Sequence, residues 1–201
     1  MTDSMHMDAQ AGVIALTAAE EDDWGPLSDL PGNPMVWLLI LSELAVFGAL
    51  FGGFAAIRVL KPDIYIASQS VLDPIAAGLA TLALVTSGWL AARALEAAKR
   101  GANPRPMLLA AMVVGTGFLV AKAFEYGAKF EHGIGIDTNA FWTLYFLTTG
   151  FHALHVVLGL LILGLLCRYD SLENIESGTA FWHMVDVIWI VLFPIVYLVR
   201  L

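Results

Sequence analysis

Residues 140–167 read AFWTLYFLTTGFHALHVVLGLLILGLLC, a run of apolar and small residues without one charged side chain. At a rise of about 1.5 Å per residue, an α-helix needs about 20 such residues to cross the hydrocarbon core of a bilayer. The run is therefore long enough for one membrane-spanning helix. A β-strand is excluded, because the run is too long for one strand of a barrel and an open sheet cannot cross lipid.

Four further apolar stretches of similar length accompany this run. Together they predict five transmembrane helices, near residues 34–58, 74–98, 105–130, 140–167 and 178–200. Prolines stand at the predicted starts of three helices, where a missing N–H costs no hydrogen bond. Pro194 lies inside the last span and is expected to kink it or weaken its final turns. The predicted fold class is all-α, a polytopic membrane helix bundle formed by residues 34–201.

The composition agrees with an integral membrane protein. Of the 201 residues, 59% are hydrophobic and 14% are charged, whereas soluble domains carry about 25% charged residues. The formal net charge of −8, with ten Lys and Arg residues, excludes a nucleic-acid-binding protein. Seven acidic residues and no basic residue fall within residues 1–30. Residues 1–33 are therefore predicted to form an acidic, largely extramembrane leader.

The basic residues near the span ends and in the connections predict the orientation, because cytoplasmic loops are enriched in Lys and Arg. One side of the membrane collects Arg93, Lys99, Arg100, Arg105 and Arg168, and the other collects Arg58, Lys61, Lys129 and Arg200. The Lys99-Arg100 turn is the densest basic cluster, so the N-terminus and the polar connection 168–177 are predicted to be cytoplasmic. The C-terminus is then periplasmic. Residues 59–73 are predicted to form the longest loop.

Ionisable side chains inside the predicted spans are the candidate functional residues. They are Glu43, Lys122, Glu125, His152, His155, His183 and Asp186. A charge at bilayer depth costs at least about 2.5–3.5 kcal/mol, so such groups usually face protein or water. Helical spacing places the members of three sets on common, inward faces. The sets are Gly115, Phe118, Lys122 and Glu125; Thr148, His152, His155 and Gly159; and His183, Asp186, Ile190 and Tyr197.

Two further patterns describe the surfaces of the helices. The motif Gly48-x-x-x-Gly52 permits close contact with another helix. Aromatic residues gather near the span ends, where most of them are predicted to anchor the helices at the membrane interface. These are Trp37, Trp142, Tyr145, Phe181, Trp182 and Tyr197.

The polar residues leave three chemical interpretations open. Interhelical hydrogen bonds are the first, with Lys122 and Glu125 spaced to pair at i, i+3. A proton path or transporter site is the second, with Glu43 beside that pair. A metal site is the third, because His152-x-x-His155 places two imidazoles on one helix face and His183 could supply another ligand. The single cysteine, Cys167, excludes both an intrachain disulfide and a cysteine-based metal cage.

Four ordered motifs resemble those of subunit III of the haem-copper terminal oxidases. In the last span, Phe181-Trp182-His183-x-x-Asp186-x-x-Trp189 is similar to the family's aromatic-Trp-His-x-x-Asp-x-x-Trp signature. The run Thr149-Gly150-Phe151-His152-Ala153-Leu154-His155-Val156, with Gly159, is similar to its Thr-Gly-Phe-His-Gly-x-His-Val-x-x-Gly signature. The third is Gly115-x-x-Phe118-Leu119-x-x-Lys122-x-x-Glu125-Tyr126, and the fourth is Ser42-Glu43 before a Phe/Gly-rich run. Glu176, seven residues before His183, also matches the family.

The resemblance implies an accessory subunit that packs on the catalytic subunit I and holds no haem or copper itself. The haem, and the copper where it is present, then belong to the partner. It further implies a role in sustained activity near the proton-entry region of subunit I, with Glu43 matching the relatives' carbodiimide-reactive glutamate. Phospholipid binding in a cleft is also implied, although the five-helix chain lacks the two helices that complete that cleft. The implied location is the bacterial cytoplasmic membrane.

Three functions besides that of a terminal oxidase subunit remain open from the sequence. The first is a subunit-III-like partner of a nitric oxide reductase. The chain resembles such proteins in its five-helix length, in residues 192–198 and in Lys122, which stands in place of the family's usual glutamine. The second is an independent transporter or channel, and the third is a histidine-metal membrane enzyme. Co-purification with a haem-bearing partner distinguishes an oxidase or reductase subunit from a transporter, and metal analysis tests the metal enzyme.

Overall fold

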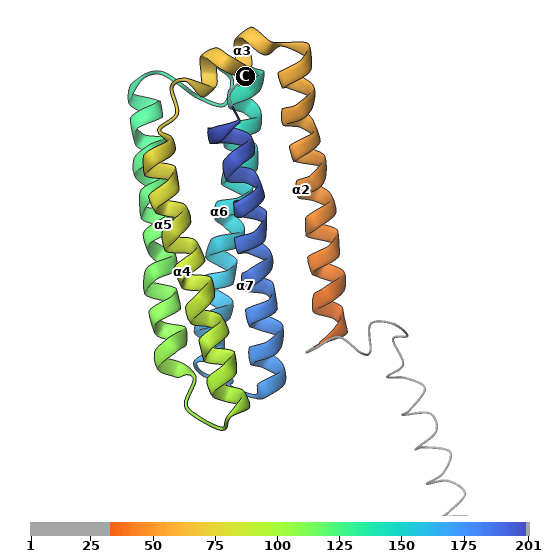
Figure 1. Ribbon diagram of the computed structural model, residues 1–201, viewed down its shortest axis with the longest axis vertical. Helices are drawn as coiled ribbons and strands as arrows, with labels where there is room; N and C mark the ends of the chain where they lie inside the picture. The colour runs from red at the N-terminus through yellow and green to blue at the C-terminus, as the bar shows by residue number, and fades with distance from the viewer. Residues whose placement is uncertain (1–32, 200–201) are drawn as a thin grey trace, which may run out of the picture.

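The computed structural model describes residues 33–199 as one helical bundle (Figure 1). Residues 1–32 and 200–201 lie outside the described part of the chain, and so does most of the predicted acidic leader. Five long helices are each apolar enough to span a membrane, which confirms the all-α prediction. The elements are α2 (Pro34–Leu60), α3 (Pro62–Gln69), α4 (Pro74–Lys99), α5 (Arg105–Glu131), α6 (Ala140–Leu166), α7 (Leu172–Phe193) and the π-helix η2 (Pro194–Leu198).

Capping side chains mark the starts of α2, α4 and α6, whereas α5 begins after Pro104 without a side-chain cap. The Asp73 side chain accepts hydrogen bonds from the first amides of α4, and Asn139 does the same for α6. Asn33 caps α2 by accepting from the Met35 amide at 2.9 Å. These oxygens satisfy backbone N–H groups that have no partner within the helix. The first four spans therefore begin where the sequence predicts.

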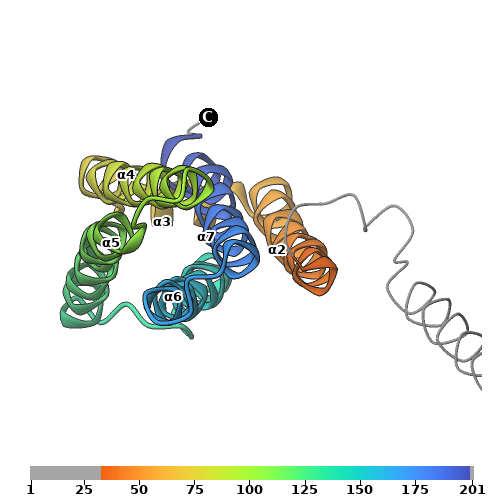
Figure 2. The same cartoon turned by 90° about the horizontal axis from the view of Figure 1, so that it is seen from below.

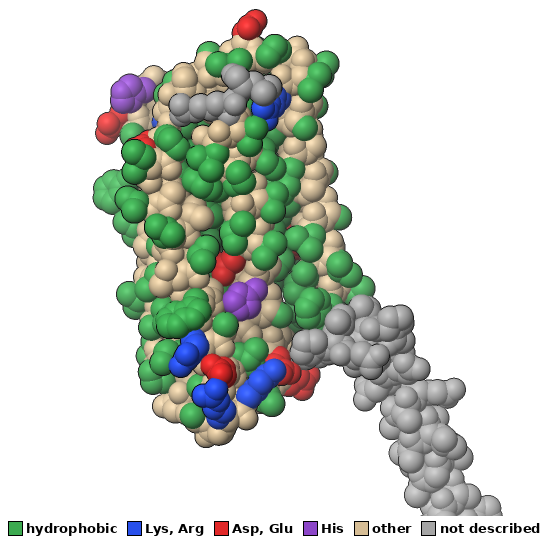
Figure 3. Space-filling model, in the orientation of Figure 1, with side chains coloured by type: hydrophobic (Ala, Val, Ile, Leu, Met, Phe, Trp, Pro, Cys, Tyr) green, Lys and Arg blue, Asp and Glu red, His purple; other side chains and the backbone are tan. Residues whose placement is uncertain are grey.

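Helices α4, α5, α6 and α7 form the bundle, and α2 packs outside it against α6 and α7 (Figure 2). Only 11% of the most apolar window of α2 is buried, against 56% for the last span. The exposed surface between the two ends is dominated by hydrophobic side chains, and charged groups gather near the ends (Figure 3). This distribution suits a bundle surrounded by hydrocarbon.

Two predicted boundaries were wrong. The connection 59–73 contains the short helix α3, which begins at a proline that is tolerated in a first turn. The last span begins at Leu172 rather than near residue 178, because the Ser171 side chain caps the helix by accepting from the Asn174 amide. The first turns of α7 are polar, so hydrophobicity alone does not reveal them.

Trp182 fills the centre of the bundle and is fully buried. Its ring lies against Gly159 of α6, where an added Cβ would come within 2.5 Å of the indole. Glycine is therefore required for the close approach of α6 and α7. Five of the six aromatic residues predicted near the interface are at most 3% exposed, namely Trp142, Tyr145, Phe181, Trp182 and Tyr197. The prediction that most of the six anchor the helices at the membrane interface was therefore wrong.

The chain after Pro194 continues from α7 as a π-helix and contacts α3. Pro194 lacks an N–H and interrupts the α-helical ladder, and the next residues continue as η2. The Tyr65 hydroxyl donates to the Ile195 carbonyl at 2.6 Å, and Gln69 Nε2 donates to the Val196 carbonyl at 2.9 Å. Burial raises the pKa of the Tyr65 phenol, opposed by the charge of Arg58, so the phenol keeps the proton that it donates.

Candidate functional site

A buried ion pair joins α5 to α6 and η2. Lys122 Nζ donates to Glu125 Oε2 at 2.9 Å and to the Tyr197 hydroxyl at 2.7 Å. The hydroxyls of Tyr145 and Tyr197 donate to Glu125 Oε1 at 2.7 and 2.8 Å. The ammonium also lies 4.9 Å from the Trp189 ring centroid, within reach of a cation–π interaction. The ammonium and the carboxylate therefore have partners in the interior of the bundle.

The two tyrosines of this cluster were missed as polar site residues. The sequence signal was available for Tyr145, because it precedes Thr148 by three residues and His152 by seven, on the face already predicted to point inward. Tyr197 was placed on an inward face, but its link to Lys122 crosses 75 positions. Helical periodicity cannot predict such a contact.

Glu43 and His155 connect α2 to α6. His155 Nδ1 lies 2.8 Å from the Phe151 carbonyl, and Nε2 lies 3.1 Å from Glu43 Oε2. A carbonyl oxygen only accepts, so Nδ1 carries a proton. Glu43 Oε2 is buried and makes no hydrogen bond to the described residues, so the contact with Nε2 is a close approach of two ionisable groups. Glu43 therefore places a carboxyl group of α2 beside an imidazole of α6.

His152 lies one turn from His155 but serves a different contact. Its Nε2 lies 3.1 Å from the Val185 carbonyl of α7, so Nε2 is the protonated nitrogen. The ring is fully buried against Phe47, Phe118 and Trp189. Within residues 33–199, no group of three or more His, Cys, Asp or Glu residues is arranged to hold a metal ion.

His183 and Asp186 lie where α7 meets α4. His183 Nδ1 is 3.7 Å from Asp186 Oδ2, and Gly88 gives this carboxyl group room, because an added Cβ would come within 1.9 Å of it. Asp186 is buried, but the His183 side chain is 43% exposed. Ile190 is 47% exposed. The prediction that His183 and Ile190 face inward with Asp186 was therefore wrong, because the inward face of α7 turns away from them.

Glu176 contributes to a charged end of the bundle. Its carboxylate lies 2.9 Å from Lys99 Nζ of α4. Arg105 donates two hydrogen bonds to Asp170 at the same end, at 3.2 and 3.0 Å. These pairs tie the α4–α5 turn to the start of α7. They are partly exposed, so each contributes little to the free energy of unfolding.

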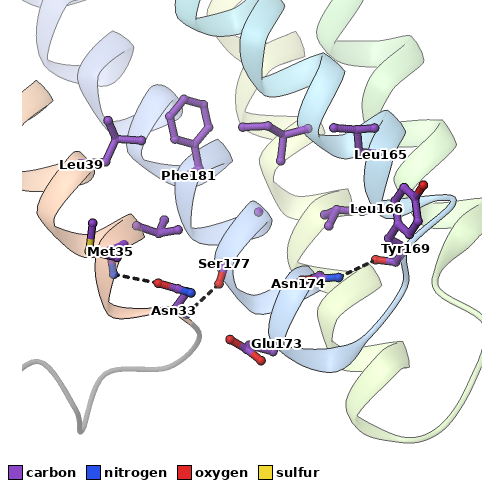
Figure 4. Close-up of a pocket in the computed structure, with 13 residues that line it drawn as sticks. Asn33, Met35, Leu39, Leu165, Leu166, Tyr169, Glu173, Asn174, Ser177 and Phe181 are labelled. Atoms are coloured by element: carbon purple, nitrogen blue, oxygen red, sulfur yellow. Dashed lines mark hydrogen bonds between the residues drawn. The ribbon is translucent and has the colours of Figure 1, made fainter. Parts of the chain in front are cut away.

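A groove separates the start of α2 from α6 and α7 (Figure 4). Its volume is about 530 Å³, and its walls are largely apolar, with Leu39, Leu165 and Phe181 among them. At its polar end, the Asn33 amide donates to the Ser177 hydroxyl at 2.8 Å. The groove therefore has apolar walls and a polar end, which lies at the end of the bundle.

Residues 33–200 match the protein family described as Cytochrome c oxidase subunit III. The chain belongs to this family. It is 30% identical over 176 residues to the Mycobacterium tuberculosis protein named probable cytochrome c oxidase subunit 3, covering 83% of this chain and 86% of the relative. It is 31% identical over 174 residues to cytochrome c oxidase subunit 3 of Synechocystis, covering 81% and 73%. Cytochrome c oxidase subunit III is a membrane protein of the respiratory chain, which agrees with the five spans.

A third relative has a compound name. It is the heme-copper oxidase subunit I+III of Aeropyrum pernix, 29% identical over 180 residues, which cover 82% of this chain and 22% of the relative.

The structure brings together the polar residues of the subunit III motifs in three contacts. These are Lys122 with Glu125, Glu43 with His155, and His183 with Asp186.

Proposed function

We propose that the chain is the accessory subunit III of a haem-copper oxidase complex and packs on the catalytic subunit I. The observation that supports this best is the Aeropyrum relative, whose name joins subunits I and III while its match to this chain covers 22% of its length. A name that joins the two subunits favours contact between them. The haem, and any copper, belong to the partner.

The proposed location is the bacterial cytoplasmic membrane with the N-terminus in the cytoplasm. The α4–α5 turn, the α6–α7 turn and the start of α2 lie at one end of the bundle (Figure 1). This end carries the Lys99-Arg100 cluster together with Arg105 and Arg168. The enrichment of basic residues on cytoplasmic loops supports the assignment. The C-terminus is then periplasmic.

The proposed role is to keep the complex assembled and active, and to support proton uptake by the partner. The Glu43–His155 pair is the feature that serves this role. It places two ionisable groups between α2 and the bundle, at bilayer depth, where an intramembrane ionisable group is costly to maintain without a function. Phospholipid is the small molecule that suits the groove beside α2, because an acyl chain matches its apolar walls.

The Glu43→Gln variant tests this role in the assembled complex. We expect the haem content and subunit composition to stay normal, because glutamine keeps the size of the side chain. The number of turnovers before inactivation should fall, or proton uptake should slow. Turnover and inactivation equal to those of the native complex would contradict a functional Glu43. The visible spectrum and gas-consumption assay of the same complex decide between an oxygen-reducing and a nitric-oxide-reducing partner.

A further inference from the structure

The exposure of His183 is unusual for its position. The residue lies near the middle of the last span, Leu172–Leu198. Its side chain is 43% exposed, and no hydrogen bond within residues 33–199 involves its ring nitrogens. A polar group that faces lipid at this depth is energetically unfavourable, and such groups usually face protein or a water-filled cavity. We therefore expect a protein surface or water, rather than lipid, to contact the outer side of α7 at His183.

His183 lines a groove formed by three spans. The groove has a volume of about 430 Å³, with Ile40 and Leu44 of α2 on one side, Leu95 of α4 on the other, and Val187 of α7 at its base. It lies on the face turned toward the viewer in Figure 1, and Figure 3 shows polar side chains interrupting the hydrophobic surface of this face. The Lys99–Glu176 pair lines the groove as well.

The wall of α2 continues beyond the groove with two glycines. Ile40, Leu44, Gly48 and Gly52 follow one another at intervals of four residues, so they lie along one side of α2. A Cβ added at Gly48 or Gly52 would meet no atom of the described residues within 4 Å. Small residues at this spacing allow a second helix to approach closely. Within the described chain, that approach is unused.

Asp186, which lies behind His183, has a second polar group without a hydrogen-bond partner. It is 5% exposed, and its Oδ1 atom has no hydrogen-bond partner among the described residues. Its other oxygen, Oδ2, lies 3.7 Å from His183 Nδ1, which is beyond hydrogen-bond distance. A neutral imidazole has one acceptor nitrogen in either tautomer, so His183 has a ring nitrogen that is left to accept a hydrogen bond. A lipid acyl chain offers no donor, whereas a helix with a hydroxyl or an amide side chain does.

We propose that this groove receives a transmembrane helix of the catalytic subunit, which presents a hydrogen-bond donor to His183. The inference rests on the proposed function, because it names the face through which that function is carried out. The helix lies along α7 between α2 and α4, with Gly48 and Gly52 permitting its approach to α2. Of the charged groups of the three spans, the Lys99–Glu176 pair lies along the same groove, so the partner also meets an ion pair there.

Substitution by tryptophan at matched positions tests the face. Val187→Trp places a bulky ring at the base of the groove, and Val120→Trp places the same ring on α5. The two valines are 50% and 49% exposed, and each lies fifteen residues into a helix that begins at the same end. We expect the haem that co-purifies with the tagged chain to fall about tenfold or more in Val187→Trp, as for an interface hot spot. It should be retained in Val120→Trp.

A side-chain series at His183 tests the hydrogen bond. His183→Leu should lose most of the co-purifying haem, and His183→Gln should recover it, because an amide oxygen can accept the same bond. Equal retention in both variants overturns the role of His183. If Val120→Trp loses the co-purifying haem while Val187→Trp retains it, the interface lies on another face and the proposal is overturned. Normal haem retention in all variants shows that the partner does not occupy this groove. Equal loss in Val187→Trp and Val120→Trp, with normal amounts of chain in the membrane, also overturns the proposal.

Crosslinking identifies the occupant of the groove in intact membranes. A benzophenone maleimide is attached to Val187→Cys in a Cys167→Ala background, and the products are analysed by mass spectrometry. The expected adduct joins this chain to the haem-bearing subunit. An adduct with phospholipid alone, or with a second copy of this chain, overturns the proposal. The native complex is the reference, and absence of haem there would contradict the proposed function itself.

Discussion

Gly159 and Trp182 show how one missing methyl group fixes the packing of two helices. Gly159→Ala would place a Cβ within 2.5 Å of the fully buried indole, so the ring or a helix must move. We expect a loss of about 1–3 kcal/mol in the free energy of unfolding, as is typical of overpacked cores. Gly117→Ala is the control, because its Cβ meets no described atom within 4 Å. Thermal denaturation in detergent compares the two variants, and equal melting temperatures would contradict the packing argument.

The buried Lys122–Glu125 pair makes a sharper prediction at the same scale. Lys122→Met leaves the Glu125 carboxylate without a cation in the interior, which should cost about 3–5 kcal/mol. The double variant Lys122→Met with Glu125→Gln removes both charges and should recover most of that loss. Lys122→Gln introduces the glutamine that the subunit III motif usually has at this position. It should lower the free energy of unfolding less than Lys122→Met does. Denaturation of the native chain, the single variants and the double variant measures these differences in the free energy of unfolding. A double variant no more stable than Lys122→Met would contradict the ion-pair account.

Among the five spans, α2 is the least buried. Its polar link to the bundle is the Glu43–His155 contact at 3.1 Å. Polar contacts between membrane helices average about 0.6 kcal/mol, so Glu43→Leu should speed the exchange of α2 amides about threefold. Hydrogen–deuterium exchange of the purified complex measures this change, with α5 as the internal reference. Exchange that rises equally in α2 and α5 would indicate general destabilisation instead.

The same elements show what the sequence can predict. The five spans follow from composition, because lipid demands long apolar runs, and the Lys122–Glu125 contact follows from helical spacing. The short helix α3 was missed because eight residues of mixed polarity carry little signal. The partner of Glu43 was missed because spacing along one helix gives a face but not the neighbour that the face meets. The outward turn of His183 was missed for the same reason.

On the scale of the whole molecule, residues 33–199 form a bundle in which Lys122 lies beside Glu125, Glu43 beside His155 and Asp186 beside the half-exposed His183. Among these residues, no cluster of His, Cys, Asp or Glu is arranged to hold a metal ion. The proposed supporting role, in which the partner carries out the redox chemistry, rests on the family match. The groove lined by α2, α4 and α7 is the surface that this account assigns to the partner.

The central claim is that this chain functions in a complex with a haem-bearing catalytic subunit. The most direct test is the visible spectrum and subunit composition of the tagged full-length chain, purified from its native membrane in mild detergent. The account predicts a haem spectrum and a larger partner subunit that remain with the chain in a fixed ratio through gel filtration. A chain that elutes alone, without haem absorbance, would contradict it.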